Sequence, residues 1–132
     1  MRLLSGSCYL PHPDKAEKGG EDAHFICEER GVVGVADGVG GWADVGVDAG
    51  EYARQLMSHS VSVIRGNPKG EVDPAKVLEK AHADTKVIGS STACIIALTD
   101  QVGTCAVYPM INENDASKSI KKFRLLKVVV DL

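Results

Sequence analysis

The chain has 132 residues, of which 44% are hydrophobic and 25% are charged, a composition typical of one soluble globular domain. Its formal net charge of -3 argues against nucleic acid or an anionic membrane as the main partner. No apolar run approaches the length of a membrane span and no signal or transit segment precedes the domain, so the default expectation is a cytoplasmic protein.

The first third of the chain predicts strands separated by short polar segments. Residues 2–10 read as a strand that prolines cut at its end, and residues 14–20 read as a polar loop. A second strand is expected at residues 21–27 and a third at residues 32–36, joined by a turn at residues 28–31. The spacing of the second and third strands predicts an antiparallel hairpin.

This hairpin brings acidic residues together. Glu21 and Asp22 open the second strand, whereas Asp37 closes the third, so all of them should lie at the same end of the sheet. Carboxylates and glycine carbonyls, such as that of Gly38, are the oxygen ligands that Mg²⁺ and Mn²⁺ use in proteins. The residues alone leave a second interpretation open, in which Glu21 and Asp22 are hydrated loop acids and Asp37 caps a turn.

The middle of the chain predicts two helices and a strand. Apolar residues recur at helical spacing from Ala49 to Ile64, with Asp44 or Asp48 as the N-cap. A second helix should begin at Asp73-Pro74 and continue to about residue 86. Residues 89–98 are small and then continuously apolar, which predicts a central strand buried on both faces.

The last part of the chain and the cysteines give weaker patterns. Residues 102–110 are compatible with a strand, but no periodicity ties residues 102–132 to what precedes them.

None of the cysteines forms a C-x-x-C pair, and all lie in or beside apolar runs. They are therefore predicted to be small core residues in a reducing compartment: Cys8, Cys27, Cys94 and Cys105.

The glycine-rich loop after Asp37 also fits a competing motif. Residues 38–43 match G-x-G-x-x-A between a strand and a helix, as dinucleotide-binding sites require. Asp37 would place a carboxylate beside the diphosphate, and the acid expected further along the fingerprint would fall in or after the amphipathic helix. Dinucleotide binding is therefore a remote alternative. His24 is assigned no catalytic role, and Trp42 is interpreted as a packing anchor.

Taken together, these motifs resemble the metal-dependent type 2C serine/threonine protein phosphatases. The resemblance covers residues 1 to about 101 and rests on three ordered segments: Gly20–His24, Val35–Gly41 and Gly89–Ala93. The flanking segments Leu10–Pro13 and Trp42–Gly46 are similar to those of the plant organellar branch of this family. The full-length members of that branch suggest a location in the chloroplast or the mitochondrion.

The resemblance implies an α+β fold, the N-terminal part of a four-layer αββα sandwich with antiparallel sheets. It divides the chain into an incomplete phosphatase domain at residues 1–101 and a divergent tail at residues 102–132. It also implies two Mn²⁺ or Mg²⁺ ions with a bridging water that attacks phosphoserine or phosphothreonine in a protein substrate. Asp37 and Glu21 would be the catalytic metal ligands, together with the Gly38 carbonyl. Asp22 would contact these ligands without binding a metal ion itself.

The chain departs from this family at several positions. Glu17 stands where many members have a phosphate-binding arginine, which Lys15 or Lys18 would replace only in part, and Val39 stands where many have histidine. The Gly-Asp-Ser-Gly-like turn and two later metal-binding aspartates are not found; Asp100, Asp115 and Asp131 have the wrong contexts. We therefore expect a truncated form with weak or no activity, or a non-catalytic binding or regulatory fragment.

Overall fold

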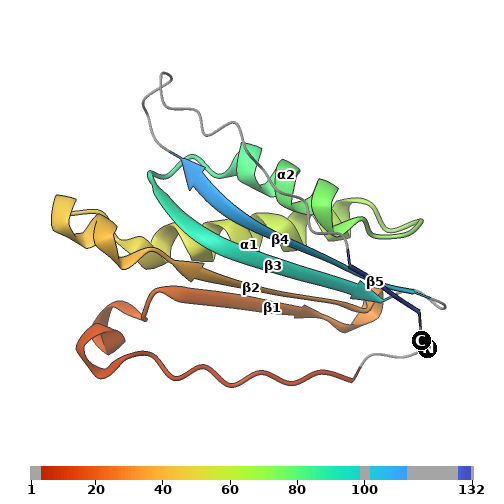
Figure 1. Ribbon diagram of the computed structural model, residues 1–132, viewed down its shortest axis with the longest axis horizontal. Helices are drawn as coiled ribbons and strands as arrows, with labels where there is room; N and C mark the ends of the chain where they lie inside the picture. The colour runs from red at the N-terminus through yellow and green to blue at the C-terminus, as the bar shows by residue number, and fades with distance from the viewer. Residues whose placement is uncertain (1–3, 99–101, 113–127, 132) are drawn as a thin grey trace.

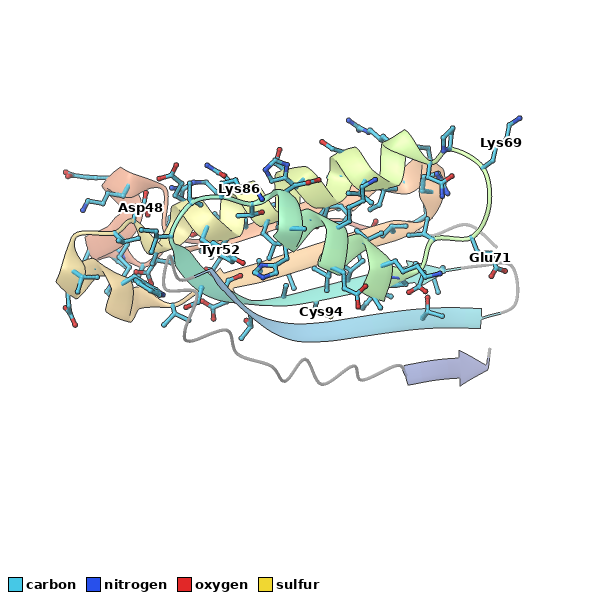
Figure 2. The ribbon with its side chains drawn as sticks, turned by 90° about the horizontal axis from the view of Figure 1, so that it is seen from above. Asp48, Tyr52, Lys69, Glu71, Lys86 and Cys94 are labelled. Atoms are coloured by element: carbon cyan, nitrogen blue, oxygen red, sulfur yellow. The ribbon has the colours of Figure 1, made fainter. Side chains whose placement is uncertain are left out.

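The computed structural model describes residues 4–98, 102–112 and 128–131 of the chain (Figure 1). The described strands form one antiparallel sheet of five strands in the order β1-β2-β3-β4-β5. Their bounds are Asp22–Cys27, Val32–Gly38, Gly89–Leu98, Val102–Asn112 and Val128–Asp131. Helices α1 (Ala49–Gly66) and α2 (Pro74–Asp84) lie together on one face of this sheet (Figures 1 and 2). The expected α+β class with an antiparallel sheet is confirmed, and the described residues form one helical layer and one sheet layer.

The β1–β2 hairpin forms as its spacing predicted. A 3-10 turn at Glu28–Arg30 ends in Gly31, whose φ of 61° is a left-handed conformation that glycine adopts without strain. The register then pairs Cys27 with Val32 at one end of the hairpin and Asp22 with Asp37 at the other. The end that carries the carboxylates therefore points away from the turn and toward the start of α1.

Both helices begin where their capping residues predicted. Asp48 caps α1 by accepting a hydrogen bond from the Gly50 N–H (2.9 Å), and Asp73 caps α2 by accepting one from the Ala75 N–H (3.0 Å). The amphipathic face of α1 packs against β1, β2 and β3, whereas α2 packs against α1, β3 and β4. The largest fully buried side chains of this core are Tyr52, Leu56, Met57, Ile64, Leu78 and Ile95.

The prediction that residues 89–98 are buried on both faces is wrong. In β3 the buried residues alternate, so that Ala93, Ile95 and Ala97 face the helices while Thr92 and Ile96 are exposed on the opposite face. The cause is the placement of α1 and α2 on a single face, because among the described residues no second layer covers the other one. The strand is central in the sheet, but only one of its faces is in the core.

The predicted strand at residues 2–10 is also wrong for its described part. Residues 4–12 have no ladder partner, although they run alongside β1, and only side chains attach them to that strand (Figure 1). The Ser7 Oγ and His24 Nε2 atoms are 2.8 Å apart, and the Asp22 N–H donates to the Tyr9 hydroxyl at 3.4 Å. Residues 14–18 of the predicted loop at 14–20 belong to a 3-10 helix, η1 (Pro13–Lys18), which proline at its first position favours.

The cysteine prediction holds for one residue and fails for another. Cys27 is fully buried in the core and Cys94 is partly buried. Cys8 is exposed, in a segment that lies outside the sheet. The side chain of Cys105 lies outside the described residues.

The strand suggested at residues 102–110 is confirmed as β4, which extends to Asn112. It pairs with β3 from Gly89 opposite Asn112 to Leu98 opposite Gly103. The strand before residue 101 and the strand after it are therefore neighbours in the same sheet. The division of the chain at that residue therefore falls between two paired strands, and the separate status of residues 102–132 stays a prediction. Neither described helix combines the length and the apolar character that crossing a membrane requires.

Candidate metal centre

Three carboxylates converge at the end of the β1–β2 hairpin, as the sequence predicted. Asp22 and Asp37 are cross-strand partners, and Glu21 immediately precedes Asp22. Burial raises the pKa of Asp22, and the negative charges of Asp37 and Glu21 raise it further, while the Lys15 charge opposes them. Several like charges in one place favour the binding of a cation, which would relieve their repulsion.

Glu21 contacts both η1 and the glycine loop. Its side chain is 20% exposed and forms an ion pair with Lys15 of η1. A Cβ atom added at Gly40 would lie 3.1 Å from both carboxylate oxygens of Glu21, so this carboxylate rests against the glycine loop. A side chain at position 40 would crowd Glu21, which gives a physical reason for glycine there.

Gly38 brings three backbone segments into contact. Its N–H donates to the Glu21 carbonyl at 2.9 Å, and an added Cβ would lie 2.3 Å from the Ala49 carbonyl oxygen and 2.7 Å from that of Glu21. Only glycine lets the end of β2 approach both Glu21 and the start of α1 so closely. The use of the Gly38 carbonyl as a metal ligand stays a prediction.

The loop after Gly38 is fixed to the start of β3. The Val39 N–H donates to the Ser90 carbonyl (2.9 Å), and the Trp42 indole N–H donates to the Ser90 hydroxyl (2.7 Å). Trp42 belongs to the short 3-10 helix η3 (Gly40–Val45) and is half-buried, in agreement with its interpretation as a packing anchor. The segments that carried the family resemblance therefore meet at one end of the sheet (Figure 1).

Arg54 is a residue of this region that sequence reasoning missed. Its guanidinium donates to the Gly20 carbonyl (3.2 Å) and to the Asp48 carboxylate (2.7 Å), linking α1 to the residue before Glu21. Gly50 allows this approach, since a Cβ there would lie 2.3 Å from the Gly20 carbonyl oxygen. The available signal was a cation in the second turn of α1, six residues after its N-cap. The contact of Lys15 with Glu21 was also not predicted.

The donor atoms fit a hard divalent cation, but the described set is incomplete. Carboxylates and backbone carbonyls suit Mn²⁺ or Mg²⁺. Within residues 4–98, 102–112 and 128–131, no group of three or more His, Cys, Asp or Glu side chains is arranged to hold a metal ion. His24 contacts Ser7 and not the carboxylates, in keeping with its having no assigned role. Asp100 and Asp115 lie outside the described residues.

The strand arrangement argues against dinucleotide binding. Every strand pair in the described sheet is antiparallel, whereas the glycine fingerprint works within a parallel βαβ unit. The glycine loop also enters a 3-10 helix, η3, and not the first turn of α1. The described part of the chain therefore lacks the framework on which a diphosphate binds to such a loop.

Comparison with known proteins identifies relatives of the N-terminal three quarters of the chain. No family model matches it. Probable protein phosphatase 2C 55 of Arabidopsis thaliana is 69% identical over 101 residues, which are 76% of this chain and 22% of the relative. Probable protein phosphatase 2C 80 of the same plant is 66% identical over 102 residues, or 76% and 25% of the two chains. The rice protein named probable protein phosphatase 2C 1 is 43% identical over 102 residues, or 76% and 30%.

A solved structure agrees with these sequence relatives. The X-ray structure of the photosystem II phosphatase PBCP superposes with a TM-score of 0.78 at 32% identity, covering 93% of this chain and 59% of that one. The chain thus spans about a quarter of the length of the first two curated relatives that it matches. Over the part that it shares with these relatives, the chain belongs to the protein phosphatase 2C family.

Proposed function

We propose that this chain forms part of the two-metal centre of a protein serine/threonine phosphatase. Glu21, Asp37 and the Gly38 carbonyl would bind Mn²⁺ or Mg²⁺, with Asp22 supporting them. The observation that carries this proposal is the convergence of Glu21 and the Asp22–Asp37 pair at one end of the sheet. Membership of the phosphatase family over the same residues supports it.

The residues of this end have separable tasks in the proposed function. When bound, the two ions would supply an activated water and neutralise phosphate charge. Asp37 is exposed on the face away from the helices, where an ion and a phosphorylated serine or threonine side chain can reach it. Glu21 is fixed in place by the contacts around Gly40, and the Gly38 N–H orients the Glu21 backbone. The substrate would be a phosphoserine or phosphothreonine protein.

For the 132-residue chain by itself we propose weak metal affinity and little or no turnover. Affinity for Mg²⁺ or Mn²⁺ depends on the number of oxygen ligands, and among the described residues no three acidic, histidine or cysteine side chains are arranged to hold a metal ion. A two-metal centre needs both ions to hold the attacking and leaving oxygens. A partial ligand set would therefore bind a cation without organising the reaction.

One observation favours a second function, a non-catalytic binding or regulatory fragment. Val35 is 56% exposed and Ile96 is 39% exposed on the sheet face opposite the helices. Exposed apolar side chains on a sheet face are a common feature of surfaces that bind another protein. Under this alternative the carboxylates would have no catalytic use, and the sheet face would be the functional surface.

The two functions differ in what Mn²⁺ does to the purified chain. The experiment combines calorimetric titration with Mn²⁺ and hydrolysis of a phosphothreonine peptide, for wild type, Asp37→Asn and the control Asp44→Asn, which removes an exposed acid of η3. We expect weak Mn²⁺ binding that Asp37→Asn abolishes and Asp44→Asn leaves intact, with little hydrolysis by any of them.

Two other results would revise the proposal. Robust Mn²⁺-dependent hydrolysis that Asp37→Asn abolishes would overturn the expectation of weak activity while supporting the phosphatase assignment. No Mn²⁺ binding together with no hydrolysis would favour the binding fragment.

A further inference from the structure

Lys15 is placed beside Glu21 by the fold of η1. The Lys15 N–H donates to the His12 carbonyl at 2.8 Å, and the Gly20 N–H donates back to the Lys15 carbonyl at 3.0 Å. The chain leaves η1 through Gly19 and Gly20, both with positive φ (81° and 75°), which glycine adopts at little cost. This tight reversal fixes the backbone of Lys15 next to the residue that precedes Glu21.

The side chain of Lys15 completes the contact. Its ammonium group forms an ion pair with the Glu21 carboxylate, and it would lie 3.3 Å from a Cβ added at Gly40. The pair is partly shielded, with 46% of the Lys15 side chain and 20% of the Glu21 side chain exposed. Arg54, another cation near this end of the sheet, donates to the Gly20 carbonyl and to the Asp48 carboxylate.

We propose that Lys15 is a built-in counter-cation for Glu21 that a divalent metal ion must displace, so that Lys15 weakens metal binding. This inference rests on the proposed function, because it takes Glu21 as a metal ligand. An ammonium group and a divalent ion on the same carboxylate repel each other, so the ion pair has to open before the ion binds. Lys15 thereby raises the metal concentration at which the Glu21 carboxylate exchanges the Lys15 ammonium group for a metal ion.

Calorimetric titration of the whole chain with Mn²⁺ tests this inference. The variants are Lys15→Met, which removes the charge, Lys15→Arg, which keeps it, and the matched control Lys18→Met, which removes the other lysine of η1. We expect Lys15→Met to bind Mn²⁺ about 1.5-fold to 5-fold more tightly, the range that corresponds to a partly exposed ion pair. Lys15→Arg should stay close to wild type, and Lys18→Met should change the affinity less than Lys15→Met does.

The outcomes separate this inference from the proposed function. If Lys15→Met binds Mn²⁺ as wild type does, or more weakly, Lys15 does not oppose the metal and the inference is wrong, while the proposed function stands. An equal gain in Lys18→Met would also overturn it, because the effect would then be one of net charge. If neither wild type nor any variant binds Mn²⁺, the proposed metal centre itself fails, and the inference fails with it. Thermal unfolding in EDTA checks that each variant is folded.

Discussion

Asp22 and Asp37 are direct cross-strand partners at the open end of the β1–β2 hairpin, on the sheet face away from the helices. Like charges in such a position destabilise a sheet. Burial is the first cause of the raised pKa of Asp22, and the charge of Asp37 is the second. The repulsion between the two carboxylates therefore lowers the stability of the metal-free chain. A bound cation would relieve this repulsion.

The first prediction concerns this pair. Asp37→Asn should raise the melting temperature of the chain in EDTA by about 2 °C at pH 7, since a cross-strand pair contributes roughly 0.2–1 kcal/mol and about 1 kcal/mol shifts the melting temperature by about 4 °C or more. Because the pKa of Asp22 is raised in the folded state, the penalty of its charge is complete above that raised pKa and disappears as the pH falls through it. The gain should therefore shrink at low pH.

Thermal unfolding followed by circular dichroism measures this gain. Asp44→Asn removes an exposed acid from η3 and should leave the melting temperature unchanged. A lower melting temperature for Asp37→Asn at pH 7 in EDTA would show that the carboxylate stabilises the metal-free fold, contrary to the prediction.

The second prediction tests the close approach at Gly38. A methyl group there would meet the backbone oxygen of Ala49 at 2.3 Å, which forces the end of β2 away from α1. Gly38→Ala should therefore lower the free energy of unfolding by about 1–3 kcal/mol in a urea titration. Gly41→Ala is the control, because an added Cβ there meets no atom within 4 Å. Equal stabilities for the two variants would contradict the packing described here.

The third prediction concerns the link between the glycine loop and β3. Ser90→Ala removes the acceptor of the Trp42 indole N–H and should lower the free energy of unfolding by about 1 kcal/mol. Trp42 is the single tryptophan of the chain, so its fluorescence reports directly on this loop. We expect a shifted emission maximum in Ser90→Ala. Ser62→Ala changes an exposed serine on α1 and should leave the emission maximum unchanged without lowering the free energy of unfolding.

The fourth prediction is a pH dependence that originates between the helices. The Tyr52 hydroxyl on α1 lies 2.7 Å from the Nδ1 atom of His82 on α2, and Figure 2 shows Tyr52 in the molecule's interior. Burial raises the pKa of Tyr52, so its hydroxyl stays protonated and shares this hydrogen bond with the neutral ring. Burial, followed by the charge of Lys86, lowers the pKa of His82 from its ordinary value of 6.5.

The sign of the effect follows from proton uptake. The unfolded chain protonates His82 at a higher pH than the folded chain does, so the stabilising contribution is complete above pH 6.5 and decreases as the pH falls toward the lowered pKa. Urea titrations between pH 8 and pH 5 should show this loss in wild type and a smaller loss in His82→Asn. His59→Gln on α1 should keep the wild-type profile.

The local elements and the convergence of the carboxylates at one end of the sheet could be predicted from the amino-acid sequence. Asp48 and Asp73 indicated where the helices begin, because a capping side chain accepts hydrogen bonds from backbone N–H groups of the first helical turn. The hairpin followed from a short turn between two apolar runs, and it placed Asp22 and Asp37 at the same end of the sheet. These features depend on residues close together in the chain, so they can be read without the fold.

The surroundings of those carboxylates could not be predicted, because they depend on tertiary packing. The Lys15–Glu21 contact and the link from Arg54 to Gly20 join segments whose approach depends on how η1 and α1 pack against the hairpin. The exposed face of β3 and the unpaired segment at residues 4–12 were mispredicted because an apolar run shows that a strand is suitable for burial, but not which layer covers it. The local sequence pattern predicted the candidate metal ligands, and packing placed the Lys15 ammonium group beside Glu21.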